Sequence, residues 1–580
     1  MPDRRSALAC AALVAAVALL YAPSLGNGFV YDDHEVIEVQ PRPAGVADLL
    51  RVFAEPHFRG LPYYRPVVRT SLLAQKALHG DRPALFHLGN ALLAGLAAAA
   101  AFALLRAPRL GVGVAPAWSA AAIFAAHPVA SSAVYPIASG RETLLPAVLI
   151  LAAVAAWLRG RRGVALGCLA LGLFAKEQAV VVPLLFLLAD LCGVAEVRGA
   201  GRQVIPASGY SGYRGWRARE WIGRYAGVVA VTLAYLAIRQ RVLGATHYEL
   251  AVVGDPAGPL RSLLFGVQVA LAPFAQLHYE PEFALWFSPA RIASAAAILV
   301  ALAVVARRAG APPARVALFW CGWFVIAQLP TANLLRQEAP FDERYAFLAL
   351  LAFPAVAAAS ATALWPRPRA RTAAIAIGAA IAVALAVVTF GRGAAFRDDA
   401  AFAAQWLRTN PASPEAHHLL AVLAAEEGRF DEAVAHYRDA LAAAPDSPDL
   451  HVNLGVALAQ LGRDAEARSE LEAALRLDPG HPEAHATLGT LLARAGRLDE
   501  AVAHHREAVR AAPRFAAAHQ NLGAALARLG HYGEAELEFR EALRLDPDSQ
   551  ESARDLAAAL VAQGRSDEAH IVLRGAALRE

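Results

Sequence analysis

The sequence predicts an all-α protein in which a polytopic transmembrane helical bundle is followed by an α-solenoid of short repeats. Of the 580 residues, 57% are hydrophobic and only 18% are charged, although soluble proteins ordinarily carry about a quarter charged residues. Apolar runs follow one another up to about residue 390, and beyond that point the chain is polar and periodic. The net charge of +4 excludes a nucleic-acid binder that relies on bulk charge.

The first part, residues 1–392, contains apolar runs of the kind that cross a membrane. We expect about eleven spans, several of them shorter than the roughly 20 residues that a bilayer requires. They lie at residues 6–23, 85–105, 116–133, 143–158, 163–175, 178–193, 222–239, 291–306, 316–330, 345–364 and 372–390. A further apolar segment, 260–276, contains Pro273, so we expect it to be re-entrant or interfacial.

Arginines in the short loops give the bundle an orientation, because positively charged loops stay in the cytoplasm. Arg4 and Arg5 place the N-terminus there, and later arginine clusters mark further cytoplasmic loops. An odd number of spans then places the loop 24–83 and the C-terminal part outside the cytoplasm. We therefore expect a multi-pass protein of a bacterial inner membrane with a periplasmic C-terminal part, which would be lumenal in a eukaryote.

Ionisable residues gather on the external face that this topology predicts. They are Asp32, Asp33, His34, Glu35, Arg65, Arg141, Glu142, Lys176, Glu177, Asp342, Glu343 and Arg344. Charges at helix ends ordinarily anchor a protein at the interface, but Lys176 and Glu177 interrupt an apolar stretch, where a buried charge is costly and typical of a site. Both signs at one face indicate a pocket with acids for chemistry and cations for an anionic substrate. Alternatively, each cation pairs with the acid beside it.

The second part repeats every 34 residues. The recurring positions are Gly428, Gly462, Gly496, Gly530 and Gly564, then Ala433, Ala467, Ala501, Ala535 and Ala569, and then Pro445, Pro479, Pro513 and Pro547. This is the tetratricopeptide signature, in which each unit is a pair of antiparallel helices. After a linker at 393–413, five units fit residues 414–447, 448–481, 482–515, 516–549 and 550–580.

Stacked units of this kind form a concave groove that commonly binds peptides or proteins. Asn453 and Asn521 are candidate groove residues, because asparagine can pair with a peptide backbone amide. Histidines in this part suggest a metal, but their recurrence on the first helix of the units favours solvated or peptide-contacting side chains. They are His417, His418, His451, His485, His504, His505 and His519. The sequence leaves a metal requirement unspecified.

The order of motifs along the chain resembles that of a known enzyme family. The motifs are Gly28-Phe29-Val30-Tyr31-Asp32-Asp33, Tyr64-Arg65-Pro66-Val67, Phe86-His87-Leu88-Gly89-Asn90, His127-Pro128-Val129, Ser139-Gly140-Arg141-Glu142, Lys176-Glu177-Gln178 and Glu343-Arg344-Tyr345. With the C-terminal repeats, they resemble the transmembrane and tetratricopeptide-repeat-containing O-mannosyltransferases. Those proteins are similar to the large GT-C-type membrane glycosyltransferases that use polyprenyl-phosphate sugars. The chain departs from the family at Ala94, where a histidine is expected.

The resemblance implies roles for these residues. An acidic residue of the first external loop acts at the reacting centre, which points equally to Asp32 and Asp33. Such a carboxylate can remove the proton of a hydroxyl acceptor, and the leaving lipid phosphate requires fixed cations or donors. The implied phosphate-binding set is Arg141, Lys176, Arg344 and His127, supported by Glu142, Glu177, Tyr64 and Arg65. Structural alternatives are a capped turn for the aspartates and a helix cap for His127.

Three functions follow from these observations. The first is a glycosyltransferase that moves a sugar, mannose by the resemblance, from a polyprenyl phosphate to Ser or Thr of exported proteins that the repeats recruit. The second is a non-catalytic, membrane-anchored scaffold for envelope proteins. The third is a lipid-linked sugar transferase that acts on glycans or lipids. The expected partners are a bilayer, a lipid-linked sugar and a protein in the groove. No nucleotide cofactor is expected, because no glycine-rich nucleotide loop is evident.

Overall fold

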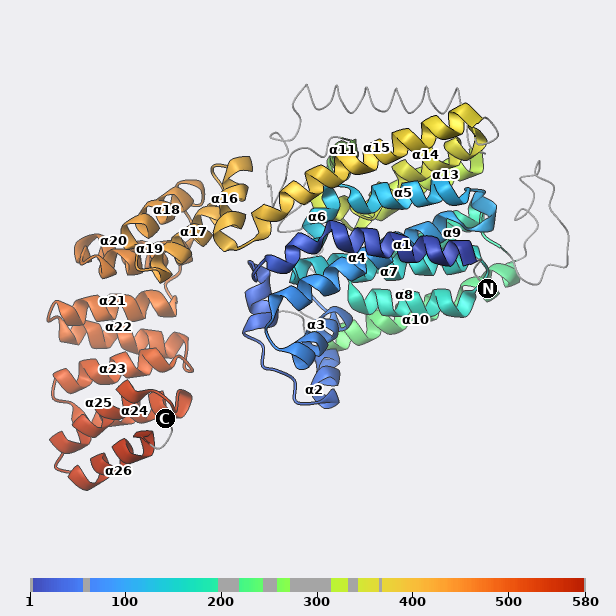
Figure 1. The fold of residues 1–580 in the computed structure, drawn as a ribbon. Helices are drawn as coiled ribbons and strands as arrows, with labels where there is room; N and C mark the ends of the chain where they lie inside the picture. Colours follow the sequence, from blue (N-terminus) through green and yellow to red (C-terminus); the bar gives the residue numbers. More distant parts are fainter. Residues whose placement is uncertain are drawn as a thin grey trace. The chain divides into compact units, whose positions relative to one another are not determined.

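The computed structural model describes residues 4–55, 63–196, 218–243, 258–271, 314–331, 343–364 and 368–577. Within these ranges the chain is helical and contains no strand. It divides into two compact units, Met1–Gln405 and Trp406–Glu580, which are coloured blue to yellow and orange to red in Figure 1.

The first unit is a bundle of helices. Its helices are α1 (Arg4–Leu20), α2 (Val46–Arg51), α3 (Pro66–His79), α4 (Pro83–Leu105), α5 (Val114–Ala126), α6 (Val129–Val134), α7 (Ala138–Leu158), α8 (Arg162–Ala175), α9 (Val182–Leu191), α10 (Ala218–Leu243), α11 (Gly258–Leu271), α13 (Ala314–Gln328), α14 (Ala352–Leu364), α15 (Pro368–Arg392) and the start of α16 (Asp399–Thr409). The short helical turns that matter below are η2 (His34–Glu38), η5 (Glu177–Val181), η8 (Glu343–Ala346) and η10 (Gly393–Phe396).

Ten of the eleven expected spans coincide with helices, and the remaining one, 291–306, lies outside the described residues. The segment 260–276 overlaps the short helix α11. Among the described residues, four helices are long and apolar enough to cross a membrane: Pro83–Leu105, Ala138–Leu158, Arg219–Leu243 and Pro368–Phe396. Five more apolar helices are shorter, with 10–17 residues each, so the total of eleven spans stays a prediction.

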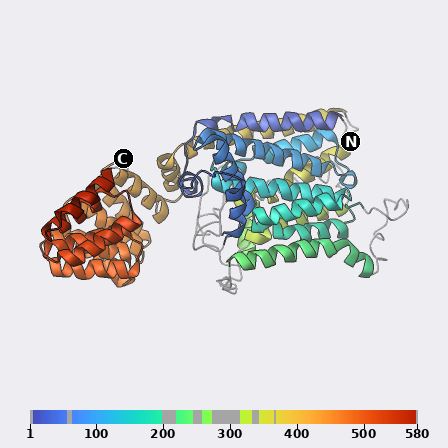
Figure 2. The ribbon, with the colours of Figure 1, turned by 90° about the horizontal axis from the view of Figure 1, so that it is seen from below.

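Helix α7 is the central helix of the bundle. Its most apolar stretch is 78% buried, and it packs against α4 and α8, while α4 in turn packs against α1. Figure 2 shows these helices side by side. The packing of α1 on α4 depends on Gly95, because a Cβ atom there would lie 3.0 Å from the Cα atom of Val14. Small residues at such contacts let apolar helices approach closely.

Helices α10 and α15 differ from α7 in that their apolar stretches face outward. Only 17% of the stretch in α10 and 6% of that in α15 are buried. The exposed side chains of α15 include Ile377, Val383 and Val387. Single exposed apolar residues are ordinary on protein surfaces, but two whole helices of this kind form extended apolar surface.

A buried ion pair joins α9 and α10 at the flank of α7. The Arg224 guanidinium donates from Nε and Nη2 to the two carboxylate oxygens of Asp190, each at 2.5 Å. Tyr225 Oη and Trp157 Nε1 donate to the same carboxylate at 2.7 Å and 3.3 Å. Because both ions are buried and their hydrogen bonds are satisfied, the pair can exist among apolar helices.

The segment 393–413, expected to be a linker, is mostly helical. It contains η10 and α16, and the boundary between the two units falls inside α16. Phe402, Ala403 and Trp406 of this segment are buried. An amphipathic helix hides such residues in a sequence that is polar on average.

The second unit consists of five helix pairs, one in each of the five predicted repeats. The helices are α17 (Pro414–Glu426), α18 (Phe430–Ala443), α19 (Pro448–Gln460), α20 (Asp464–Leu477), α21 (Pro482–Arg494), α22 (Leu498–Ala511), α23 (Ala516–Arg528), α24 (Tyr532–Leu545), α25 (Gln550–Ala562) and α26 (Ser566–Ala577). The five recurring glycines follow the first helix of each pair with φ between 73° and 83°, a left-handed conformation that favours glycine.

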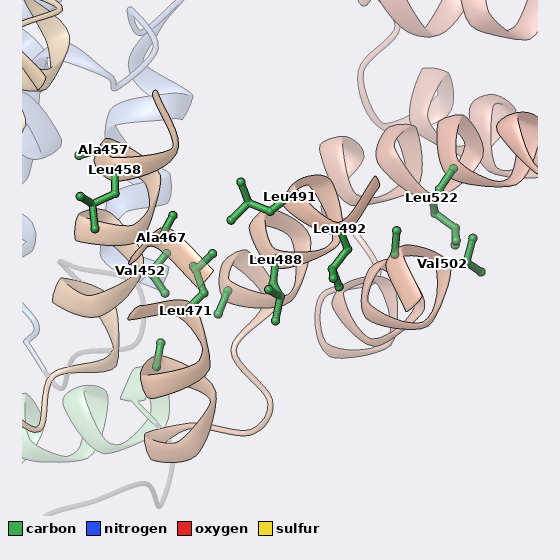
Figure 3. Packing of buried hydrophobic residues seen from close by; sticks show 14 of the residues in the cluster. Val452, Ala457, Leu458, Ala467, Leu471, Leu488, Leu491, Leu492, Val502 and Leu522 are labelled. Carbon is green, nitrogen blue, oxygen red and sulfur yellow. The ribbon is translucent and has the colours of Figure 1, made fainter. Parts of the chain in front are cut away.

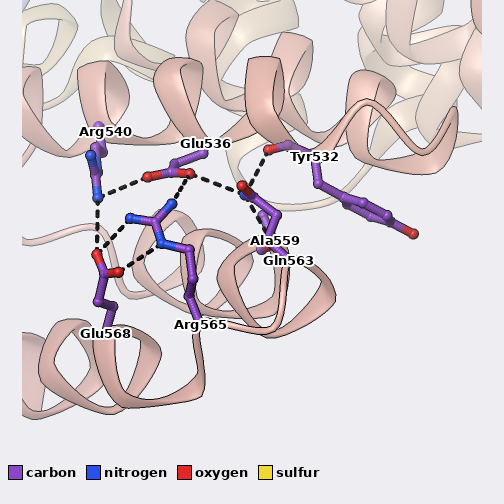
Figure 4. Close-up of polar contacts among 7 residues, drawn as sticks. All are labelled: Tyr532, Glu536, Arg540, Ala559, Gln563, Arg565 and Glu568. Atoms are coloured by element: carbon purple, nitrogen blue, oxygen red, sulfur yellow. Dashed lines mark hydrogen bonds and ion pairs between the residues drawn. The ribbon is translucent and has the colours of Figure 1, made fainter.

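Other repeated residues explain how the pairs begin and pack. The side chains of Ser413, Ser447 and Ser549 accept a hydrogen bond from an amide of the first helical turn, as N-caps do. Leucines, alanines and valines of successive helices form one continuous core, part of which is shown in Figure 3. Polar contacts add to it between the last two pairs, where Glu536 accepts from Arg565 Nη1 at 2.7 Å and Gln563 Nε2 at 3.0 Å (Figure 4).

We expect Asp190→Asn to destabilise the bundle by about 3–5 kcal/mol, because it leaves the buried Arg224 charge without its counterion. Thermal unfolding of the purified chain in detergent measures this loss. Glu35→Gln makes the same chemical change at an exposed position and should alter stability by less than about 0.5 kcal/mol. Equal melting temperatures of the two variants would contradict a structural role for the Asp190–Arg224 ion pair.

Two glycines of the fourth repeat should respond oppositely to alanine. At Gly523 a new Cβ atom would lie 2.7 Å from the Phe539 ring, whereas at Gly533 it meets nothing within 4 Å. Gly523→Ala should cost about 1–3 kcal/mol through overpacking, and Gly533→Ala should stabilise by about 0.5–1 kcal/mol through helix propensity. Urea unfolding followed by circular dichroism distinguishes the two, and effects of the same sign would contradict this packing.

Candidate functional site

The candidate site lies around the first turn of α7, where segments far apart in the sequence meet. Residues of the loop 24–83, of the α8–η5 junction and of η8 all supply ionisable side chains at this end of the bundle. The structure brings some of the predicted site residues into contact and gives others separate surroundings.

Asp33 is fully buried against the N-terminus of α7. Its Oδ1 accepts a hydrogen bond from the amide of Ala138 at 2.6 Å, and its Oδ2 accepts from the amides of Ile137 and Val30, each at 3.2 Å. Burial raises the pKa of this carboxyl to about 7, against the opposing effect of the three amides. Asp33 therefore caps α7, which corresponds to the capped-turn alternative rather than to a base that reaches a substrate.

Asp32 is only partly buried, and an unusual backbone conformation precedes it. Tyr31 has φ of 51°, the one positive value among the described non-glycine residues. Its amide donates to Asp399 Oδ1 at 2.8 Å, and its ring lies 5.9 Å from that of Phe402. Left-handed backbone at a non-glycine residue is costly and often found at functional sites. Of the two candidate bases, Asp32 is the one with access to solvent.

His34 connects the same loop to α16. Its Nε2 lies 2.9 Å from Asp399 Oδ2, and its Nδ1 lies 2.5 Å from Glu38 Oε2. Partial burial favours the neutral ring, but these two carboxylates outweigh it and raise the His34 pKa above its ordinary value. Backbone contacts add to the connection, since the Gly28 amide donates to the Arg397 carbonyl at 2.9 Å.

Arg65 binds Glu142 and Glu177, the acids that the alternative interpretation paired with the cations beside them, Arg141 and Lys176. Its Nη1 donates to Glu142 Oε2 at 2.5 Å, and its Nε donates to Glu177 Oε2 at 3.2 Å. Its guanidinium also lies 4.5 Å from the centre of the Tyr63 ring. Burial favours neutral groups, but the ion pairs outweigh it, raising the pKa of Arg65 and lowering that of Glu177.

Tyr64 makes one hydrogen bond to the bundle and one within its own loop. The Tyr64 amide donates to Glu177 Oε1 at 3.4 Å, and the Tyr64 hydroxyl donates to the Phe53 carbonyl at 2.8 Å. The predicted supporting residues Glu142, Glu177, Tyr64 and Arg65 thus form one connected group.

Arg141 is buried and points away from this group, toward α3 and α4. Its Nε donates to Asn90 Oδ1 at 2.8 Å, its Nη1 to Ser71 Oγ at 3.2 Å, and its Nη2 to Gln75 Oε1 at 2.5 Å. All three partners are neutral, and no ion pair with Glu142 forms. Within the described segments, Arg141 is a buried cation that no carboxylate neutralises.

Lys176 is the second such cation. It is buried at the junction of α8 and η5, and within the part of the chain that the structure describes it forms no ion pair with a carboxylate. Burial lowers its pKa to about 8; the charges of Arg65 and Arg344 act in the same direction, and those of Glu142 and Glu177 oppose it. An anion bound beside a buried ammonium group stabilises its charged form.

Arg344 and His127 lie in different surroundings. Arg344, on η8, is partly buried and lines a small cavity of about 10 Å³ with Thr143 and Gln178. His127 follows α5, where its Nε2 lies 3.1 Å from the Ala270 carbonyl and its Nδ1 accepts from the Val129 amide at 3.3 Å. This arrangement of His127 corresponds to the helix-cap alternative.

Several residues of this site escaped the sequence analysis. Asn90 was noted only as part of a motif, and Ser71, Gln75 and Asp399 were not noted at all. Asn90 orients Arg141 and also donates from Nδ2 to the carbonyls of Pro136 and Ile137 at 3.0 Å and 3.1 Å. The sequence feature that could have indicated this role is a polar residue, Asn90, within the apolar helix α4.

The second unit contains a groove in which both predicted asparagines lie. A cavity of about 720 Å³ is lined by residues of the first four repeats, among them Asn453, Asn521, His418, Thr487 and Arg494. Asn453 Nδ2 lies 3.2 Å from His418 Nε2. The mixed lining of apolar, polar and charged side chains suits a peptide segment.

The comparisons with known proteins concern the repeats. Models described as tetratricopeptide repeat match residues 424–491, 465–529, 516–549 and 392–448, so the C-terminal unit consists of tetratricopeptide repeats. No curated protein sequence matches the chain.

Among solved structures, MamA from Desulfovibrio magneticus RS-1 is 21% identical, with a TM-score of 0.26, and the match covers 28% of this chain and 92% of that one. MamA AMB-1 is 26% identical, with a TM-score of 0.25 and coverages of 28% and 89%. YrrB, titled a TPR protein with an unusual peptide-binding site, is 20% identical, with a TM-score of 0.26 and coverages of 30% and 90%.

The contact between His34 and Asp399 should make stability depend on pH. A histidine whose pKa is raised by folding stabilises the fold below its unfolded pKa of about 6.5 and loses this contribution as the pH rises through the folded value. Melting temperatures between about pH 5.5 and pH 8.5 should therefore fall less steeply for Asp399→Asn than for the natural chain. Asp398→Asn, one residue away, should retain the natural slope; an unchanged slope in Asp399→Asn would contradict this coupling.

Proposed function

We propose that this chain is a membrane glycosyltransferase that moves a sugar from a polyprenyl phosphate to a hydroxyl group of an exported protein. Mannose is the proposed sugar, by the resemblance to the transmembrane and tetratricopeptide-repeat-containing O-mannosyltransferases. The observation that carries the proposal is the pair of buried cations, Arg141 and Lys176, which have no carboxylate partner among the described residues at the end of the bundle where Asp32 lies.

A membrane location is supported by the outer surface of the first unit. Helices α10 and α15 expose most of their apolar side chains, and contiguous apolar surface of this extent marks contact with a membrane or another protein. The arginine distribution orients the bundle so that the first turn of α7 faces the outside of the cytoplasm. A lipid-linked donor would then reach the site from the bilayer.

The cations supply the means to hold the donor phosphate. The Lys176 ammonium would act as a point charge, and Arg141, whose three nitrogens already donate to neutral side chains, would add its positive charge. Glu142 and Glu177 are both occupied by Arg65, which leaves Lys176 available for an anionic ligand. Arg344, close to Lys176, would add positive charge as the phosphate departs.

Asp32 is the proposed general base. Its carboxylate takes the proton of the acceptor hydroxyl while the hydroxyl oxygen forms a bond to the anomeric carbon of the sugar. The bond between that carbon and the phosphate oxygen breaks, and the polyprenyl phosphate leaves with the electron pair. One displacement of this kind inverts the sugar configuration and requires no covalent sugar–enzyme intermediate.

The tetratricopeptide groove is the proposed binding place of the acceptor protein. Because both units belong to one chain, a protein held in the groove has a raised effective concentration at the bundle. The groove also favours a second candidate function, a non-catalytic scaffold for envelope proteins, since a cavity of about 720 Å³ can bind a partner without any transfer reaction. Membrane attachment would be shared by both functions.

The test is transfer of mannose from a polyprenyl-phosphate mannose to acceptor proteins, read by mass spectrometry of glycopeptides. Asp32→Asn should lower the rate by about 100-fold or more, as loss of a general base does, and Lys176→Gln should raise the KM for the lipid donor. Asp48→Asn, in the same external loop, is the matched control and should transfer at the natural rate.

The two candidate functions predict different outcomes for the groove. In the transferase, Asn453→Ala combined with Asn521→Ala lowers modification of the protein acceptor but not of a short peptide. If neither Asp32→Asn nor Lys176→Gln changes any glycan on exported proteins, while the groove variant abolishes partner binding, the scaffold replaces the transferase.

A further inference from the structure

The first helix of four successive repeats carries a histidine in the same orientation. His417, His451, His485 and His519 each place Nε2 at 3.1–3.2 Å from the carbonyl of the proline six residues earlier. Since a carbonyl only accepts, Nε2 carries the hydrogen, and Nδ1 is turned toward the second helix of the pair. His417, His485 and His519 are buried, so of the two expected roles, solvated or peptide-contacting, they do not have the solvated one.

The residue that faces Nδ1 alternates along the array. In the second and fourth repeats it is a carboxylate, with His451 Nδ1 at 2.7 Å from Glu470 and His519 Nδ1 at 2.6 Å from Glu538. In the first and third repeats it is another histidine, with Nδ1 atoms 3.2 Å apart between His417 and His436 and 2.9 Å apart between His485 and His504.

An acid completes the group in the first repeat. Asp439 lies one helical turn beyond His436, and its Oδ2 is 3.8 Å from His417 Nδ1. One ligand atom from each of His417, His436 and Asp439 lies within 4.8 Å of the others. The matching acid of the third repeat, Glu507, is instead bound to Arg510.

We propose that His417, His436 and Asp439 bind a divalent transition-metal cation of the zinc class. Two nitrogens bound to one tetrahedral zinc ion lie about 3.3 Å apart, given zinc–nitrogen distances of about 2.0–2.1 Å. The observed 3.2 Å between the two Nδ1 atoms matches this separation. Imidazole nitrogens with one carboxylate oxygen are ligands that suit zinc better than calcium or magnesium.

The hydrogen bond to the Pro411 carbonyl strengthens the assignment. Metal-binding histidines commonly donate their other ring N–H to a carbonyl, which fixes the tautomer and the ring orientation. Asp439 is exposed, so its carboxylate can move toward a bound ion. Three protein ligands leave a fourth position for water or for a group of the protein bound to the repeats.

The test is zinc binding to the full-length chain, purified in detergent with a tag that contains no histidine and stripped with a chelator. Titration of zinc against a chromogenic competitor should give one site that His436→Gln and Asp439→Asn each weaken by at least about 10-fold. Glu470→Gln makes a comparable change at the matching position of the second repeat and should retain the natural affinity. Zinc should also raise the melting temperature of the natural chain and not that of His436→Gln.

Equal zinc affinity in the natural chain and in both variants would overturn the proposal, and so would loss of the site through His504→Gln alone. Absence of zinc binding at micromolar concentration would overturn it as well, and the two histidines would then share an N–H···N hydrogen bond. If His436→Gln fails to fold, the zinc affinity of Asp439→Asn tests the proposal alone, because an exposed carboxylate can be replaced without disturbing the core.

Discussion

The Asp33 carboxylate at the N-terminus of α7 is the contact on which the rest of the candidate site depends. It accepts hydrogen bonds from two amides that begin α7 and from Val30 in its own loop. A helix N-terminus has unpaired amides and a partial positive charge, so a carboxylate stabilises it. This contact sets where the loop 24–83 lies against α7, and it thereby places Asp32 near the first turn that carries Arg141 and Glu142.

Arg141 and Glu142, adjacent on the first turn of α7, point in different directions. Adjacent residues of a helix point about 100° apart, so Glu142 faces Arg65 while Arg141 faces α3 and α4. Arg65 then neutralises both Glu142 and Glu177. Among the residues that the structure describes, both acids are therefore paired with Arg65, while the buried cations Arg141 and Lys176 have no carboxylate partner. A site of this kind is suited to a ligand that carries negative charge.

The sequence predicted the repeats well, because their signals are local. A left-handed glycine, a capping serine and a proline after each second helix act within one unit, and each recurs every 34 residues. The gathering of charges at one end of the bundle was also predictable, from loop arginines and apolar runs.

The pairing of these charges was not predictable. Arg65 binds partners 77 and 112 residues away, and nothing in the adjacent residues indicates this choice. The role of Asp33 was hidden for another reason, since its partners are backbone amides that any residue supplies. The burial of His417, His485 and His519 was not predictable either, because a proline carbonyl, which no sequence pattern marks, holds each ring in place.

The connection between the first loop and α16 has a consequence for how the chain is made. Tyr31 and His34 bind Asp399 across 368 and 365 residues of sequence. A ribosome that adds about 5–20 residues per second takes roughly 20–70 s to cover that interval. The segment around Asp32 therefore cannot complete its contacts until nearly the whole bundle has been synthesised. A chain interrupted before α16 would contain every buried cation of the site and still lack the contact that holds its proposed base.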